Sequence, residues 1–459
     1  MTDVARRLLL PALILLLVAC WLGGGVTSDD TGIDEGLQLL ALPVLLLAAA
    51  TLLDETPSPW VRRGLWVAAA IAMVPAVQLL PIPAALWHLP PARQALAADI
   101  AVAGVTVAPH WSLTPAASER ALWALLPAMA AFLAACALTA VQRRRLLQAL
   151  VGLVAFNVVF AFFQAGLPQE SDLRLYQDFD AGFGGLLANT NHQATACIIG
   201  MALAVGLAAE SRLRAVRGQA HPHRHWWYWG LATGFLLMVP LSTSRAGMSI
   251  VLPVLALALW LTRVLKLRQI GRSRRATALA LGLVVLSVVG ARAAIGWLAV
   301  DQAEEIRHTL AAAAVAMGKA EAPLGSGMGS FVPAFEQAAP ASLQMANYVN
   351  HAHNEYAQWW MTAGWLGMLA LAAALLLLVA AGWQIARAHG RNAVLAGASL
   401  AALCAVLAHS WADYPLRTLT LMATCGALAG VLLAALGDMS QARQAAETAN
   451  DTPEEAQPL

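Results

Sequence analysis

One short stretch gathers most of the side chains that are able to do chemistry. Residues 350–356 read Asn-His-Ala-His-Asn-Glu-Tyr and stand directly before a long apolar run. His351 and His353 are two apart, whereas two histidines that bind zinc from one helix are typically four apart. A neutral imidazole is the natural general base for a hydroxyl nucleophile. We predict that His353 is this base and His351 the second choice or a substrate contact, with Asn354 and Glu355 orienting the base or binding substrate hydroxyls. The same residues would also suit the cap of a helix that starts near Asn354.

Three arginines form a second group with a shared chemistry. Arg245 follows the Ser/Thr-rich turn 242–244, and Arg417 follows Asp413 and Pro415. Both are expected at helix N-termini, where free backbone N–H groups and a guanidinium together suit an anion. Arg174 lies in a loop expected on the same side of a membrane. The alternatives are arginines that snorkel to an interface, or a salt bridge between Asp413 and Arg417. Because all three oppose the charge bias of their side, we predict an anion site.

Other polar motifs are less specific. Asn189 and Asn191 open an apolar run and either line a cavity or cap a helix. Asp178-Phe179-Asp180 has the form used by metal-dependent nucleotide-sugar transferases, but its loop is expected to face outward, so no metal is predicted there. The histidine tract at 221–225 lies in a basic loop and is interpreted as a solvated anchor. Gly325, Gly327 and Gly329 predict a tight loop, or one whose amides approach a ligand.

The composition excludes a soluble globular protein. The chain has 459 residues, of which 59% are hydrophobic and only 12% charged, and its mean hydropathy is +0.65. Soluble domains carry about 25% charged residues. Long Ala- and Leu-rich runs without alternation indicate helices, so the class is an all-α polytopic membrane protein. The five cysteines all lie in apolar runs, with no metal or disulfide spacing.

About twelve spans are expected, since each needs about 20 apolar residues. They are 7–23, 36–53, 64–81, 121–141, 146–166, 187–209, 226–241, 245–263, 276–298, 357–381, 392–410 and 417–437. A long outer loop, 299–356, separates the ninth span from the tenth. We predict a membrane domain over 1–437 and a disordered cytoplasmic tail over 438–459.

The positive charges set the orientation. With the N-terminus inside, 20 of the 28 Lys and Arg residues fall on the cytoplasmic side. The other eight are Arg93, Arg120, Arg174, Arg245, Arg292, Arg307, Lys319 and Arg417. Every short loop then obeys the positive-inside rule, and both termini are cytoplasmic. The histidines and the three arginines consequently face the outer side, where polar residues beside lipid are costly without a function or a partner.

Several short elements, in this order, resemble the O-antigen ligase and O-antigen polymerase superfamily of bacterial membrane proteins. They are Leu113-Thr114-Pro115, Gly182 through Asn191, Thr243-Ser244-Arg245-Ala246-Gly247, Pro323-Leu324-Gly325 with Gly327 and Gly329, His353-Asn354-Glu355-Tyr356, Gly364-Trp365-Leu366-Gly367 and Asp413-Tyr414-Pro415-Leu416-Arg417. Each element is short, and it is their combination on one side of the membrane that is specific.

The resemblance implies a GT-C-like fold of about a dozen helices and a periplasmic active site in the inner membrane. It also implies inverting transfer of a glycan from undecaprenyl diphosphate, without metal or other cofactor. The acceptor is a sugar of the lipid A core, a second lipid-linked glycan, or a protein hydroxyl, and no nucleic acid is involved. Arg245, Arg417 and Arg174 would bind the diphosphate.

Under the same resemblance, glycan contacts are expected from Asn354, Asn191, Asn189 and Asp413.

The main alternative function is a transporter or flippase for a lipid-linked or small anionic substrate, which predicts internal repeats and charges buried in mid-span. The third function considered is that of a non-catalytic scaffold. The gathering of polar residues on one side favours the enzyme.

Overall fold

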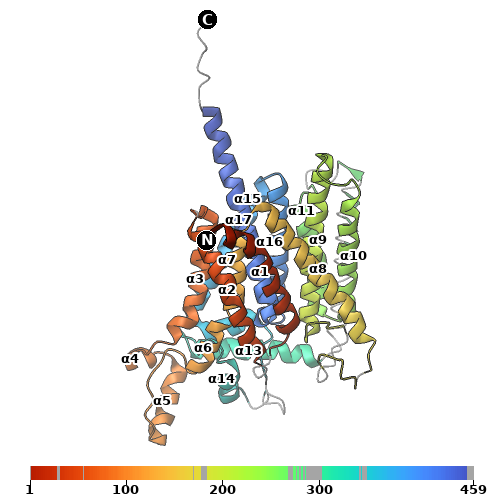
Figure 1. The fold of residues 1–459 in the computed structure, drawn as a ribbon. Helices are drawn as coiled ribbons and strands as arrows, with labels where there is room; N and C mark the ends of the chain where they lie inside the picture. Colours follow the sequence, from red (N-terminus) through yellow and green to blue (C-terminus); the bar gives the residue numbers. More distant parts are fainter. Residues whose placement is uncertain are drawn as a thin grey trace.

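The computed structural model contains helices and no strands in the ranges it describes (Figure 1). These ranges are 2–27, 32–54, 56–168, 170–176, 183–266, 272–274, 277–278, 281–282, 285, 302–340, 343 and 349–451. Within them, nine helical segments are long and apolar enough to cross a membrane. They are α1 (Thr2–Gly23), α2 (Ile33–Leu53), α3 (Pro59–Gln78), α6 with α7 (Pro115–Trp123 and Leu126–Ala137), α8 (Ala140–Ala165), α9 (Thr190–Val216), α15 (Glu355–Arg387), α16 (Arg391–His409) and α17 (Leu419–Asp451). The predicted class, an all-α polytopic membrane protein, is confirmed.

Three of the twelve predicted spans are not among these nine. The helix α10 (Arg224–Leu241) opens with Arg224, His225 and a Trp/Tyr-rich turn of low hydropathy, and α11 (Arg245–Leu261) has 17 residues. Both nevertheless pack against α9 (Figure 1). The third, 276–298, falls mostly outside the described residues. The count of twelve therefore stays a prediction.

The centre of the bundle is α9. It packs against α8, α10, α11 and α16, and nearly all of its side chains are buried. Its apolar residues surround the whole helix, which is the pattern of a helix enclosed by others. Gly206 lies so close to Ala398 of α16 that a side chain there would overlap it. Small residues at such crossings let the two backbones approach.

The last three spans bring the predicted site residues to one end of this bundle. The short turn after α16 carries Asp413, followed by a 3-10 turn at Pro415–Arg417 and then by α17. At the same end lie α13 (Gln302–Ala320) and α14 (Phe331–Ala338), which form a small apolar cluster with Ala352 and Met361. Because Ala352 is buried in this cluster, the histidine segment is anchored against α13 and α14.

The helix α15 is broken at Gly364, and a glycine-rich loop fills the break. Gly364 has φ +59° and ψ −154°, which lie outside helical values. The amides of Ser326 and Gly327 donate to the carbonyls of Met361 and Thr362, each at 2.9 Å. Gly325, Gly327 and Gly329 all have positive φ, a conformation that glycine adopts without strain. The tight loop expected at these glycines is present, and two of its amides bind the α15 backbone.

A hairpin of two short helices, α4 (Ala84–Trp87) and α5 (Pro91–Ala103), projects beside this end (Figure 1). Its Arg93 side chain is fully buried. Arg93 pairs with Glu321 at 3.1 Å and donates to the carbonyls of Trp111 and Gly325. One buried cation therefore ties the base of the hairpin to the glycine-rich loop.

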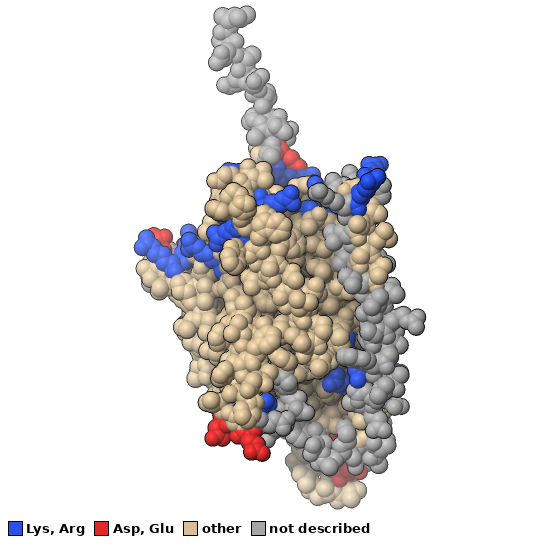
Figure 2. All heavy atoms as spheres, turned by 90° about the vertical axis from the view of Figure 1, so that its right-hand side faces the viewer, with Lys and Arg blue, Asp and Glu red and all other residues tan. Residues whose placement is uncertain are grey.

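Both chain ends lie toward the other end of the bundle (Figure 1). On the face drawn in Figure 2, most Lys and Arg side chains gather toward the end from which α17 projects, and the middle of that face is nearly free of charge. This distribution fits a membrane protein whose two termini share one side.

The tail is expected to be disordered from residue 438, but in the structure α17 continues to Asp451. The segment after Gly437 is rich in Ala, Gln, Glu and Arg, all good helix formers. Arg443 and Glu447, one turn apart, add an ion pair at 2.8 Å. Residues 452–459 of the predicted tail lie outside the described residues.

Candidate active site

Asp413 is the centre of the polar cluster at this end. Its side chain is fully buried. It accepts hydrogen bonds from His353 Nδ1 at 3.2 Å, from Asn189 Nδ2 at 3.1 Å and from Asn191 Nδ2 at 2.6 Å. The amide of Tyr414 donates a further one at 3.0 Å. Three side-chain donors from two distant segments, and the amide of the next residue, thus converge on one carboxylate.

This environment keeps Asp413 ionised. Burial alone would raise the pKa of Asp413, but the hydrogen bond from His353 and the electrostatic influence of His192, His353 and Arg307 lower it below its ordinary value. An ionised carboxylate only accepts hydrogen bonds, so the proton must reside on Nδ1 of His353. The other ring nitrogen, Nε2, is then the basic one. His353 is therefore oriented as a base, and its side chain is 18% exposed.

The backbone that holds His353 is fixed by local capping. His353 itself has φ +49°, a left-handed conformation that is uncommon for a residue with a side chain. The next residue, Asn354, caps α15 by accepting from the amide of Ala357 at 3.0 Å, and its own amide group donates to the Trp411 carbonyl at 2.8 Å. The Glu355 amide donates to the Ser410 carbonyl. The histidine segment is thus joined to the turn that carries Asp413.

The ring of Tyr414 packs against three imidazoles. Its centroid lies 4.2 Å from that of His351, 4.9 Å from His353 and 5.1 Å from His192. Gln358 lies 3.1 Å from Nδ1 of His351. Burial, together with the positive charges of Arg417 and His353, lowers the pKa of His351 to about 3. His351 is consequently neutral at physiological pH and is placed to line the site.

Glu355 is not a partner of His353 in this structure. It pairs with Arg417 at 3.0 Å and accepts from the amide of Leu416 at 3.1 Å. The alternative prediction, a salt bridge between Asp413 and Arg417, is therefore wrong, because Arg417 pairs with Glu355. The Nη2 atom of Arg417 is buried and has no hydrogen-bond partner among the described residues. A buried guanidinium nitrogen in this state is suited to an anionic ligand.

Arg245 and Arg174 lie at different positions. Arg245 is the first residue of α11, which Ser244 caps, and Gly247 of the same turn is in close contact with Ala194 in the first turn of α9. Arg245 therefore starts its helix beside the one that carries Asn189 and Asn191. Arg174 instead donates to the Leu167 carbonyl at 2.8 Å within its own loop. No contact to the other predicted site residues is recorded for it within the described ranges.

One further cation belongs to the cluster. Arg307 of α13 is near enough to Asp413 to lower its pKa, and it acts in the same direction on the neighbouring Tyr414. In the sequence it stands out only as one of eight cations away from the inner loops. A buried pair, Thr195 and His409, lies behind the asparagines with 2.6 Å between Oγ1 and Nδ1. The spacing of residues along the sequence does not predict this pair, because Thr195 belongs to α9 and His409 to α16.

In the described part of the chain, no three His, Cys, Asp or Glu side chains lie close enough together to hold a metal ion. Asp178, Asp180 and Gly182 lie outside the described residues. The tract 221–225 is largely exposed, at the start of α10.

Fold and site together define a polytopic membrane protein with a partly buried His–Asp pair and several arginines at one end. The family described as O-antigen ligase matches residues 229–372, from α10 to the break in α15. This match confirms the superfamily that the sequence motifs resemble, the O-antigen ligases and polymerases, and it supports glycan transfer of that general type. The matched region contains Arg245, Arg307 and the histidine segment. No curated protein matches the chain.

Proposed function

We propose that this protein transfers a glycan from undecaprenyl diphosphate to a hydroxyl acceptor at the periplasmic face of the bacterial inner membrane. The reaction inverts the anomeric carbon and needs no metal. The observation that carries the proposal is the hydrogen bond between His353 Nδ1 and Asp413, which leaves Nε2 of a partly exposed imidazole as a base. The family match and the cationic side chains beside this pair support the same chemistry.

In the proposed reaction the acceptor hydroxyl attacks the anomeric carbon of the donor. Its proton passes to Nε2 of His353, while the bond between the anomeric carbon and the diphosphate oxygen breaks. The resulting imidazolium is stabilised by ionised Asp413, which stays unprotonated because its pKa is low. Attack from the side opposite to the leaving group accounts for inversion in a single displacement.

The diphosphate leaves with an added negative charge, and the arginines are proposed to stabilise it. Arg417 offers its buried Nη2, while its Nε stays paired with Glu355, which fixes the guanidinium. Arg245 and Arg307 are the further candidates beside the cluster. Arg174 is the least supported of the three predicted arginines, because its recorded side-chain bond is to its own loop.

The remaining predicted residues receive adjusted roles. Asn189 and Asn191 donate to Asp413, so we assign them to positioning the carboxylate ahead of direct glycan contact. Asn354 acts through the helix cap that sets the backbone of His353. Glu355 acts through Arg417. His351, neutral and beside Tyr414, is a candidate contact for sugar hydroxyls.

An in vitro transfer assay tests the proposal. Purified protein is mixed with undecaprenyl-diphosphate glycan from the native host, in EDTA, with either lipid A-core or more lipid-linked glycan as the acceptor. Product on lipid A-core indicates a ligase, and a ladder of longer lipid-linked glycans indicates a polymerase. A protein acceptor is the third arm. If a host extract consumes the donor but the purified protein leaves all of it intact, the proposal fails and a transporter gains support.

A further inference from the structure

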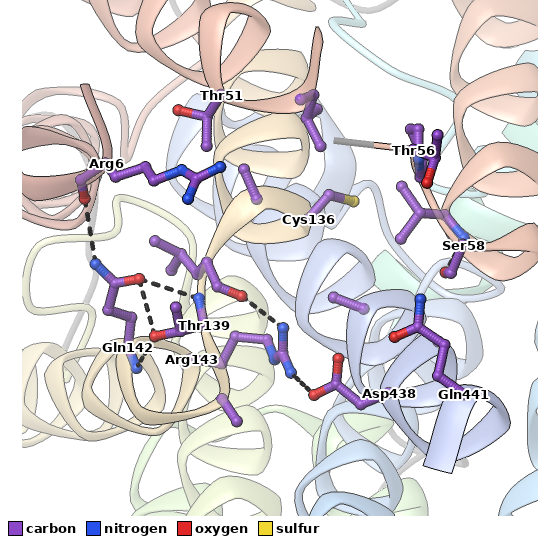
Figure 3. Close-up of a pocket in the computed structure, with 18 of the residues that line it drawn as sticks. Arg6, Thr51, Thr56, Ser58, Cys136, Thr139, Gln142, Arg143, Asp438 and Gln441 are labelled. Atoms are coloured by element: carbon purple, nitrogen blue, oxygen red, sulfur yellow. Dashed lines mark hydrogen bonds and ion pairs between the residues drawn. The ribbon is translucent and has the colours of Figure 1, made fainter. Parts of the chain in front are cut away.

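A polar cavity of about 500 Å³ lies at the opposite end of the bundle from the His–Asp pair. It is enclosed by the first turns of α1, the turn between α2 and α3, the turn between α7 and α8, and the cytoplasm-directed part of α17 (Figure 3). Its volume falls in the range of small-ligand sites. None of its residues takes part in the proposed glycan transfer.

The arginines that line this cavity differ in how strongly they are paired with carboxylates. Arg143 is almost fully buried, pairs with Asp438 and donates to the Leu138 carbonyl, so its charge is already compensated. Arg6 pairs with Asp54 across 3.8 Å, and both side chains are nearly half exposed. Such exposed pairs are weak and exchange readily. Arg7 is exposed at the same rim. An incoming anion would thus meet Arg6 and Arg7, with the exposed carboxylate of Asp3 at the same rim.

Two helix starts add to this positive potential. Ser58 caps α3, and Thr139 caps α8 through a reciprocal pair of bonds with Gln142. Both caps line the cavity, so the positive ends of two long helices point toward it. The hydroxyl of Ser58 and the amide group of Gln441 add potential donors to the wall (Figure 3).

We propose that this cavity binds a phosphate group. Guanidinium side chains, helix N-termini and neutral donors are the groups that recognise phosphate oxygens. Basic pockets between membrane helices on the cytoplasmic side are also where anionic lipid headgroups bind. The phosphate is supplied either by an anionic lipid of the inner leaflet or by a soluble phosphate, and the same side chains serve both.

The test compares two double variants of the full chain. In R6Q/R7Q two exposed charges that line the cavity are removed, whereas R62Q/R63Q removes two exposed charges at the same end that do not line the cavity. Binding is measured by native mass spectrometry and by the shift in melting temperature. The probes are phosphatidylglycerol in phosphatidylcholine nanodiscs, and inorganic phosphate in detergent.

We expect R6Q/R7Q to weaken binding at least about tenfold, equivalent to about 1.4 kcal/mol, and R62Q/R63Q to leave it unchanged. Protection by phosphatidylglycerol alone identifies a lipid headgroup, and protection by inorganic phosphate identifies a soluble ligand. Equal losses in both double variants, or no binding of either probe to the unaltered protein, would overturn the proposal.

A third variant keeps the proposal testable if R6Q/R7Q does not fold. Asp54→Asn removes the carboxylate that competes for Arg6 without touching the cavity wall. Binding of the effective probe should then become tighter. Unchanged or weaker binding in Asp54→Asn would count against a phosphate at Arg6.

Discussion

At the scale of residues, His353 is oriented by a carboxylate 60 positions further along the chain. Asp413 in turn is held by two asparagines from the start of α9. The base, its orienting group and the positioning residues thus come from separate segments. Removing any one of them should affect the reaction while the rest of the cluster stays in place.

The first prediction concerns the base. His353→Ala should lower the transfer rate about 10²–10⁴-fold, because no other group at the site takes the acceptor proton. Asp413→Asn should also lower it strongly, since an amide cannot stabilise the imidazolium. The rate is measured on product formed from the lipid-linked donor. His88→Ala, exposed at the same end of the bundle, is the matched control and should keep full activity.

If His353→Ala retained a rate close to that of the unaltered protein, with a normal melting curve, the base would have to be another group. His351 would then be the next residue to replace.

The second prediction concerns acid stability. His351 has a pKa of about 3 in the folded protein, against 6.5 ordinarily. Between these values the unfolded chain binds a proton that the folded one does not, so stability falls as pH drops below about 6.5. His351→Asn removes this titration. Its melting temperature should therefore decline less than that of the unaltered protein between about pH 7.5 and pH 5. Equal declines would show that His351 does not contribute.

At the scale of elements, the break in α15 decides where the histidine segment lies. The first part of the helix, before Gly364, starts at Glu355, two residues after His353. The inserted loop 323–329 binds the carbonyls that the break exposes. Backbone groups at membrane depth must be paired in this way, because lipid offers no partner.

The third prediction tests this break. Gly364→Ala places a side chain at φ +59°, and its Cβ would lie 2.5 Å from the Pro323 carbonyl oxygen. We expect a loss of at least about 1–3 kcal/mol, together with reduced transfer. Gly382→Ala, in the regular part of the same helix, contacts only the end of the Leu400 side chain at 3.4 Å and should be neutral or slightly stabilising. Melting curves of the two variants separate these outcomes, and similar curves would argue against a required break.

The fourth prediction concerns Arg93 and the hairpin. Arg93→Gln leaves the carboxylate of Glu321 buried without its cation, which typically costs about 3–5 kcal/mol. Limited proteolysis should then cut the segment 79–114 faster than in the unaltered protein. Arg120→Gln, an exposed arginine of the nearby α6, serves as the control and should leave cleavage unchanged. Equal cleavage rates for both variants would indicate that Arg93 does not anchor the hairpin.

At the scale of the whole molecule, the chemistry and the chain ends occupy opposite ends of one bundle. The His–Asp pair lies at the end that carries α13 and α14, whereas both termini and the proposed phosphate cavity lie at the other end (Figure 1). By the positive-inside rule, the positive charges of the inner loops predict that this end faces the cytoplasm. The site would then face the periplasm, as the proposed lipid-linked donor requires.

The fifth prediction tests this orientation. A cysteine at Val102, which is 90% exposed on the hairpin, should react with a membrane-impermeant thiol reagent in cells whose inner membrane is intact. A cysteine at Arg62 should react only after that membrane is opened. The five native cysteines are buried or partly buried and provide a low background. The reverse labelling pattern would invert the proposed topology.

The sequence by itself determined the membrane class and most of the spans, and it predicts the shared side of the termini and the segments that carry the proposed site. These depend on hydropathy and on charge along the chain, which are local properties. The helix start that Asn354 caps also follows from local residue types. The break at Gly364 does not, because the predicted span 357–381 is continuous and the loop that fills the break comes from residues 323–329.

Only the tertiary structure decided which side chains meet. It paired His353 with Asp413 and Glu355 with Arg417, added Arg307 to the cluster, and directed amides of the glycine-rich loop to α15. It also extended the last helix to Asp451. The reason is physical: a partner across the bundle is set by how distant helices pack, and the spacing of residues along one segment carries no record of that packing.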